Sequence, residues 1–95
     1  MCRIYLSGAI TGTDNYAERF ARAEEKLIAL GYEVINPARV NAELPPMEWE
    51  EYMHISLAEL SLCDAIYMLR NYKTSMGAQR ELGYAMGAGM RIMWE

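Results

Sequence analysis

The sequence is poor in basic residues, cysteine and histidine. Nine lysines and arginines stand against thirteen acidic residues, and the resulting formal charge of −4 argues against a nucleic-acid backbone as partner. Cys2 and Cys63 have neither metal-binding nor redox spacing, and the single histidine, His54, cannot build a zinc site. We therefore expect no metal, no cofactor, and two reduced cysteines that pack as small apolar side chains.

Long apolar runs are also missing. No stretch approaches the roughly 20 residues that span a bilayer, and the start MCRIYLSG lacks the apolar length of a signal peptide. We therefore expect a cytoplasmic protein without membrane contact. The chain of 95 residues, 53% of them apolar, predicts one globular domain over residues 1–95, which would bury about two-thirds of its unfolded surface.

Strand-like and helix-like segments alternate along the chain. Short β-prone runs fall at 3–6, 32–35, 65–69 and 90–94, each ended by turn residues or by a helical pattern. Three helices are expected between them, the second starting at Pro46. Residues 38–45 are expected to form a loop. The apolar stripes of the first two helices are Ala17, Phe20, Ala23, Leu27 and Leu30, then Trp49, Met53, Leu57 and Leu60, with Glu24 on the solvated face of the first.

This alternation predicts an α/β protein with three layers. We expect a flavodoxin-like, Rossmann-like fold around a four-stranded parallel sheet in the order 2-1-3-4. Ligands of such sheets bind beyond the carboxyl ends of the strands, at the switch point between the first and third strands. The segments expected at that edge are therefore the candidates for a binding site.

Four segments are expected to reach this edge. The segment Asn36–Arg39 opens a loop long enough to act as a lid, and each of the other three has two interpretations. The segment Ser7–Thr13 offers amides and hydroxyls for a sugar or phosphate, or it is a plain glycine-rich turn. Trp49 can stack on a base or pack in the core, and Arg70 and Lys73 can hold a phosphate or lie on the surface as ordinary cations. The candidate ligand-binding residues are Ser7, Gly8, Ala9, Ile10, Asn36, Trp49, Arg70, Lys73, Ser75 and Gly77.

The third helix, SMGAQRELGYAMGAG at 75–89, has an unusual composition. Ser75 is a credible N-cap, and the free amides of the first turn favour an anion. Ala78, Leu82, Ala85 and Met86 are expected to face the sheet, and Glu81 would border this stripe and project toward the cleft. The glycines at 83, 87 and 89 suggest close backbone packing, against the sheet or against a second subunit.

Several motifs together resemble the nucleoside 2-deoxyribosyltransferase-like superfamily, and most of all its short, uncharacterised bacterial and phage members. They are IYLSGAITG, VINPA, WEEYM, CDAIYML and SMGAQRELGYAMGAG, in this order over almost the whole chain. The resemblance implies that Glu81 is a nucleophile that attacks the anomeric carbon of a nucleoside. It also implies that Tyr5 holds this glutamate, and that Ser75 and the Ser7–Thr13 loop bind sugar or phosphate.

One position departs from the superfamily's pattern. Its second acid, which protonates or orients the leaving base, corresponds here to Ser56, eight residues before Asp64. Serine is not a general acid near neutral pH, and such a loss typically costs about 10²–10⁴-fold in rate. His54 and Glu59 are the nearby alternatives, although His54 faces elsewhere on an ideal helix.

Two functions remain open at this point. The first is an enzyme that cleaves the N-glycosidic bond of a nucleoside or nucleotide, or transfers its deoxyribose, through Glu81. The second is a catalytically depleted module that binds or sequesters a nucleotide or an ADP-ribose-like ligand. Under both, the partner is a small nucleoside or nucleotide, and the glycine-lined helix predicts a homodimer or a higher homo-oligomer.

Overall fold

The computed structural model describes residues 2–95. Its elements in chain order are β1 (Arg3–Ser7), α1 (Tyr16–Ala29), β2 (Glu33–Ile35), α2 (Pro37–Ala42), α3 (Trp49–Leu60), β3 (Ala65–Met68), the short 3-10 helix η1 (Tyr72–Thr74), α4 (Met76–Gly87) and β4 (Arg91–Trp94). No helix in this described range is both long and apolar enough to cross a membrane.

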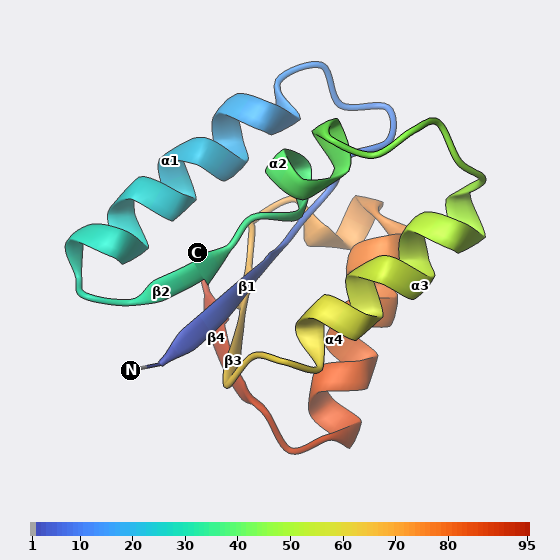
Figure 1. Cartoon of the computed structure of the whole chain (residues 1–95). Coiled ribbons are helices and arrows are strands. Elements are labelled where there is room, and N and C mark those ends of the chain that lie inside the picture. The colour runs from blue at the N-terminus through green and yellow to red at the C-terminus, as the bar shows by residue number, and fades with distance from the viewer. Residues whose placement is uncertain (1) are drawn as a thin grey trace.

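The four strands form one parallel sheet in the order β2-β1-β3-β4, which confirms the predicted fold class and topology (Figure 1). Tyr5 in β1 pairs with Ile35 in β2 on one side and with Ile66 in β3 on the other. Met68 in β3 pairs with Trp94 in β4. Because all strands run the same way, the ends of β1 and β3 lie side by side at the carboxyl edge.

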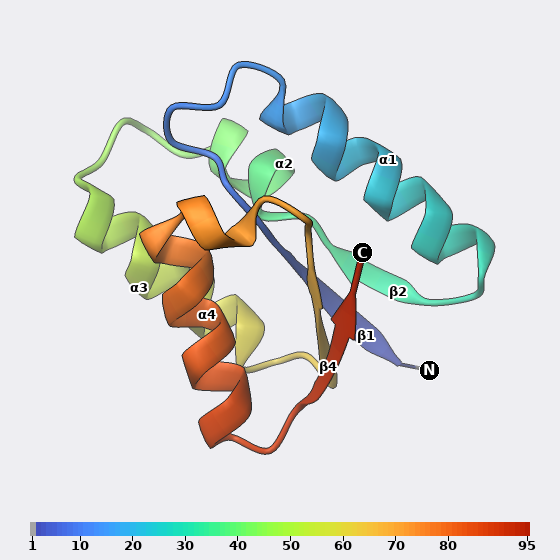
Figure 2. The ribbon, with the colours of Figure 1, turned by 180° about the vertical axis from the view of Figure 1, so that it is seen from behind.

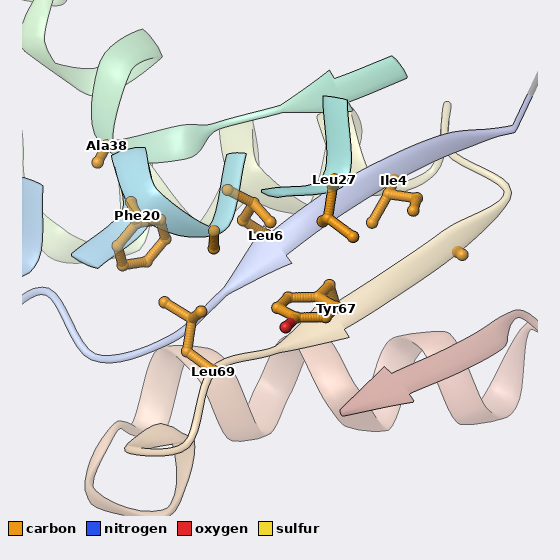
Figure 3. Packing of buried hydrophobic residues seen from close by; sticks show 9 residues of the cluster. Ile4, Leu6, Phe20, Leu27, Ala38, Tyr67 and Leu69 are labelled. Carbon is orange, nitrogen blue, oxygen red and sulfur yellow. The ribbon is translucent and has the colours of Figure 1, made fainter. Parts of the chain in front are cut away.

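Helices cover both faces of the sheet (Figures 1 and 2). The alternation of side chains along each strand divides the core accordingly, since successive residues point to opposite faces. Ile4 and Leu6 of β1 pack with Phe20 and Leu27 of α1, as Figure 3 shows. Tyr5 belongs to the other cluster, between the sheet and the helices α3 and α4. Every second residue of β1 is thus directed toward α4.

The segment predicted as a loop at 38–45 is wrong in its first half, because residues 37–42 form the helix α2. The Asn36 side chain accepts hydrogen bonds from the amides of Ala38 and Arg39, and Pro37 occupies the first turn, where its missing N–H costs nothing. Conversely, the predicted helix from Pro46 begins only at Trp49. Glu48 and Glu51 form a capping box there, so residues 43–48 connect two helices.

The predicted apolar stripe of α1 is wrong at both ends. Ala17 and Leu30 are exposed, while Phe20, Ala23 and Leu27 are buried. Glu24, assigned to the solvated face, is also buried, and its Oε1 accepts hydrogen bonds from Asn36 and Arg39. A carboxylate can be buried here because both donors come from the start of α2, which packs against α1.

The prediction that the glycines of α4 pack closely against the sheet is also wrong. A Cβ atom placed on Gly83, Gly87 or Gly89 would meet no atom within 4 Å. Gly89 has a φ of +70°, a left-handed conformation that follows the end of the helix and favours glycine. Met86, predicted to face the sheet, is 63% exposed. These residues therefore form the outer face of α4.

Candidate functional site

Glu81 lies in the middle of the buried face of α4. Its neighbours on that face are Ala78 and Ala85, three and four residues away, and Glu81 itself is only 6% exposed. The prediction that Glu81 borders the buried stripe is therefore wrong in detail, because Glu81 is one of its members. The small alanines on either side leave room for the carboxylate between α4 and the sheet.

Two hydroxyl groups of β1 hold the Glu81 carboxylate. Tyr5 donates a hydrogen bond from its phenol oxygen to Oε2 at 2.7 Å, and Ser7 donates from Oγ to Oε1 at 2.6 Å. Tyr5 and Ser7 are two residues apart on one strand, so both point to the same face of the sheet. Each oxygen of the carboxylate thus has one neutral donor, and its remaining lone pairs are available to a reactant.

The site tunes the proton affinity of Glu81. Burial raises the pKa of Glu81 to about 7, while the hydrogen bonds from Ser7 and Tyr5 work against this rise because they favour the ionised form. The pKa of Tyr5 is raised well above its usual value by burial and by the charge of Glu81. The phenol therefore stays protonated and remains a donor, and Glu81 exchanges its proton near neutral pH.

A cavity of about 310 Å³ opens above Glu81. It lies at the carboxyl edge of the sheet, since Gly8 and Ile10, which follow β1, and Ser75 and Gly77, at the start of α4, all line it. A cavity of this size is at the lower end of the range for small-molecule sites. The complete lining is Tyr5, Gly8, Ile10, Thr11, Tyr16, Phe20, Pro37, Ala38, Asn41, Ala42, Trp49, Tyr52, Met53, Ser56, Ser75, Gly77, Ala78 and Glu81.

The structure brings most of the predicted site residues to this cavity. Gly8 is required there, because a Cβ atom on it would lie 2.7 Å from the Leu69 side chain. Ser75 caps α4 by accepting a hydrogen bond from the amide of Ala78, as predicted. Ser7 and Ala9 do not line the cavity themselves: Ser7 is fully buried beneath it on Glu81, and the Ala9 amide donates to Asn71.

Three other predicted residues lie away from the cavity wall. The Asn36 side chain is occupied by the cap of α2 and by Glu24. Arg70 is exposed, and its backbone amide donates to Glu95, which follows β4. Lys73 is exposed in η1. No cation among the described residues lines the cavity, so this geometry lends the predicted phosphate contact of Arg70 and Lys73 no support.

The helix α2 forms one wall of the cavity, where the sequence predicted only a loop at the same edge of the sheet. Pro37, Ala38, Asn41 and Ala42 line the cavity from this helix. Asn41 Oδ1 is buried and has no hydrogen-bond partner among the described residues. A buried carbonyl oxygen without a donor is costly, so a ligand donor at this position would be favoured. The sequence did contain a signal for this helix. Asn36-Pro37 is a typical helix start, and Pro37, Ala38, Asn41 and Ala42 follow it at helical spacing.

A second hollow of about 300 Å³ adjoins the first at the amino end of α4. It shares Thr11, Trp49, Ser75 and Gly77 with the main cavity. Arg80 packs over the Trp49 ring, with its guanidinium carbon 4.8 Å from the ring centroid. Trp49 is 36% exposed, so it lies at the mouth of the cavity and not in the core.

Ser56 lines the cavity and is 5% exposed, at the position where the resemblance implies an acid. Neither of the two alternatives replaces it. His54 is exposed, and neither His54 nor Glu59 is part of the lining. Burial raises the pKa of Glu59, and its Oε1 is enclosed without a partner in the described part of the chain. Within residues 2–95, no three His, Cys, Asp or Glu side chains gather as a metal site.

The parallel sheet, its order and the helices on both faces define an α/β protein with the fold of the nucleoside 2-deoxyribosyltransferases. Two solved structures carry this assignment. A 2-deoxyribosyltransferase from Bacillus psychrosaccharolyticus aligns with a TM-score of 0.74 at 23% identity, over 97% of this chain and 70% of that enzyme. A 2-deoxyribosyltransferase from Leishmania mexicana gives 0.74 at 18% identity, over 99% of this chain and 63% of its own length.

The chain belongs to the family described as a domain of unknown function, DUF4406, whose model matches residues 2–94. No curated protein matches it. The similarity to the two transferases is a similarity of fold, and the chain is shorter than either of them.

Proposed function

We propose that this protein cleaves the N-glycosidic bond of a nucleoside, or transfers its sugar to another base, with Glu81 as the nucleophile. The observation that carries the proposal is the buried Glu81 carboxylate below the cavity, with one donor on each oxygen. The fold shared with 2-deoxyribosyltransferases supports it. The aromatic lining, with Tyr16, Phe20 and Trp49, suits a flat base.

The proposed reaction has two displacements. A carboxylate oxygen of Glu81 attacks the anomeric carbon, the bond to the base breaks, and a glycosyl ester forms. Water or a second base then attacks the same carbon and releases the carboxylate, so that the configuration is retained. Tyr5 and Ser7 orient the nucleophile.

Covalent labelling tests this proposal. A 2-fluoro-2-deoxynucleoside with an activated leaving group should leave its sugar on Glu81, detectable as a mass increase of that peptide. Glu81→Gln is nearly isosteric and should abolish both labelling and turnover. Glu59→Gln is the control, because it removes a half-buried carboxyl that does not line the cavity, and it should label.

The second candidate is a binding module without chemistry, and Ser56 is the observation that favours it. A cavity that binds nucleosides but never forms the ester on Glu81 would establish this alternative and contradict the enzyme.

We also propose that the protein forms a homodimer or a higher homo-oligomer through the outer face of α4. Met76 is 71% exposed and Tyr84 is 39% exposed. A Cβ atom on Gly83 or Gly87 would meet no atom within 4 Å, so this face of α4 is uncovered at the glycines. Gly83→Arg tests this, because the new side chain meets no atom of its own chain. Light scattering should show an oligomer for the wild type and a folded monomer for Gly83→Arg; a monomeric wild type of 10.9 kDa would contradict the proposal.

A further inference from the structure

The cavity is unusual in its charge. Of the described residues that line it, Glu81 alone carries a formal charge, and none is an aspartate, histidine, lysine or arginine. The other lining side chains are uncharged: they are aromatic, aliphatic or hydroxylic, apart from the Asn41 amide and the Met53 thioether. The aromatic rings, which surround a single carboxylate, are Tyr5, Tyr16, Phe20, Trp49 and Tyr52.

This lining has a consequence for the leaving group. An ordinary purine or pyrimidine departs as an anion unless an acid protonates it, which is why such sites carry a general acid. Here Ser56 occupies the place of that acid. Two of the phenols already donate elsewhere, because Tyr5 binds Glu81 and the Tyr52 hydroxyl donates to the Pro45 carbonyl at 3.3 Å.

From these observations we propose that the substrate is a cationic N-glycoside, a nucleoside whose base is quaternised at the glycosidic nitrogen, such as a pyridinium nucleoside. This inference rests on the proposed nucleophile and names its substrate class. A base of this kind needs no proton in order to leave. The absence of an acid from the lining is then a fit to the substrate and not a loss.

The atoms and charges of this reaction balance without any further reagent. An oxygen of Glu81 bonds to the anomeric carbon, and the electron pair of the carbon–nitrogen bond passes to the ring nitrogen, which becomes neutral. The heterocycle leaves as a neutral molecule. Water then attacks the anomeric carbon, the ester oxygen departs as carboxylate, and the water's surplus proton passes to solvent, so that each turnover releases one proton.

The same residues suit the binding of a cation. Aromatic faces attract cationic rings, and the attraction grows when water is excluded. Arg80 already lies over the Trp49 ring, so we expect this attraction from the other lining rings, Tyr16, Phe20 and Tyr52. Glu81 adds the opposite charge at the cavity floor, 6% exposed. A cation beside this carboxylate favours its ionised form, so a cationic substrate would help to prepare the nucleophile, whose pKa burial raises to about 7. Because none of the described lining residues is a cation, we expect the nucleoside and not its 5′-phosphate to be the better substrate.

A comparison of two single-ring nucleosides tests the inference. Nicotinamide riboside is the cationic probe and uridine the neutral one, each in ribo and 2′-deoxyribo form, and nicotinamide mononucleotide adds the phosphate. Wild-type protein should cleave the cationic nucleoside and leave uridine essentially uncleaved. Ser56→Asp should raise kcat/KM for uridine by ~10-fold or more, within the range of a restored general acid, and change that for the cationic nucleoside by less than ~2-fold. For each substrate, Ser56→Asp is compared with the wild type, so the ratio of the two fold-changes in kcat/KM does not depend on how reactive each substrate is by itself.

Binding gives a second measurement that does not depend on the Ser56→Asp protein folding. Dihydronicotinamide riboside has nearly the same shape as nicotinamide riboside without its charge. Wild-type protein should bind the cationic form more tightly, by ~10-fold or more, whereas Glu81→Gln should lose most of this preference.

The outcomes separate this inference from the proposed function. If wild type cleaves uridine as fast as the cationic nucleoside, or if Ser56→Asp changes kcat/KM for both substrates by the same factor, the substrate class is wrong and the nucleophile stands. If the activated fluoro-nucleoside labels Glu81 but the cationic nucleoside is neither bound in preference nor cleaved, the inference again fails alone. If Glu81 is never labelled, both fail.

Discussion

Glu81 shows how much one residue's role depends on its neighbours. A glutamate in a helix is usually a solvated side chain, and its sequence position alone gives no reason to expect otherwise. In the structure it is buried between two alanines of its own helix and accepts hydrogen bonds from Tyr5 and Ser7. Burial, which raises its pKa, and these two hydroxyls, which lower it, together place its titration close to neutrality.

At the residue scale, we predict a pH profile governed by Glu81. The attacking carboxylate must be ionised, so kcat/KM of the wild type should rise with pH and level off above the pKa of about 7. Ser7→Ala removes a donor that favours the ionised form and should shift this limb to higher pH by about 1 unit or more, since a hydrogen bond to a charged group contributes about 1.5–3 kcal/mol. Rates measured across pH 5–9 would show the shift.

Tyr5→Phe should also shift the rise of kcat/KM to higher pH, because it removes the other hydrogen bond that lowers the pKa of Glu81. Thr11→Val is the control: Thr11 lines the cavity but makes no hydrogen bond to Glu81, so its limb should stay in place. A limb that is unmoved in Ser7→Ala and Tyr5→Phe would mean that Glu81 is not the group that titrates.

At the scale of elements, α2 contributes most to the site for its length. This helix of six residues supplies one wall of the cavity and the unpaired Asn41 oxygen. Two sets of hydrogen bonds hold it. The Asn36 side chain caps its first turn, and both Asn36 and Arg39 donate to the Glu24 carboxylate of α1. So short a helix is not stable by itself; these contacts fix it over the cavity.

We therefore predict that Asn36→Ala destabilises the protein by about 1–2 kcal/mol, the usual cost of a lost N-cap at its upper range. It should also weaken nucleoside binding, because α2 forms a cavity wall. Asn15→Ala is a matched control, since Asn15 is the N-cap residue of α1 but its side chain makes no capping hydrogen bond. Urea unfolding and ligand titration of both variants provide the comparison; equal effects of the two changes would contradict the role of the cap.

At the scale of the whole molecule, the burial of Glu81 opposes stability. A carboxyl whose pKa rises from 4.5 in the unfolded chain to about 7 in the folded one holds its proton more tightly when folded. The stabilisation that the protonated carboxyl gives the folded state is therefore fully present below pH 4.5 and is lost as the pH rises through 7. At about 1.36 kcal/mol per pKa unit, the loss is on the order of 3 kcal/mol.

We predict that Glu81→Gln is more stable than the wild type at pH 8, by about 1–3 kcal/mol, and that the difference shrinks toward pH 4.5. Glutamine keeps the shape and can bond to both hydroxyls, but it carries no charge to bury. Urea midpoints at the two pH values measure this. Parallel pH dependence in the two proteins would show that Glu81 is not desolvated in the folded state.

The residues by themselves determined the layered architecture. Short β-prone runs and an apolar period of three to four are local properties, so the strands and most helices could be predicted, and the sheet order 2-1-3-4 followed from their alternation. Glu81 and Tyr5 became candidates through the resemblance of the motifs. Only the tertiary structure decided the rest. Ser7 turned out to hold Glu81 because β1 directs every second side chain toward α4. Asn41 and the aromatic wall line the cavity because residues of α1, α2 and α3 meet above one edge of the sheet. Arg70 and Lys73 follow the same edge in sequence, yet they lie outside the cavity. Distances between segments and the burial of a charge arise only when the chain packs, and no local pattern encodes them.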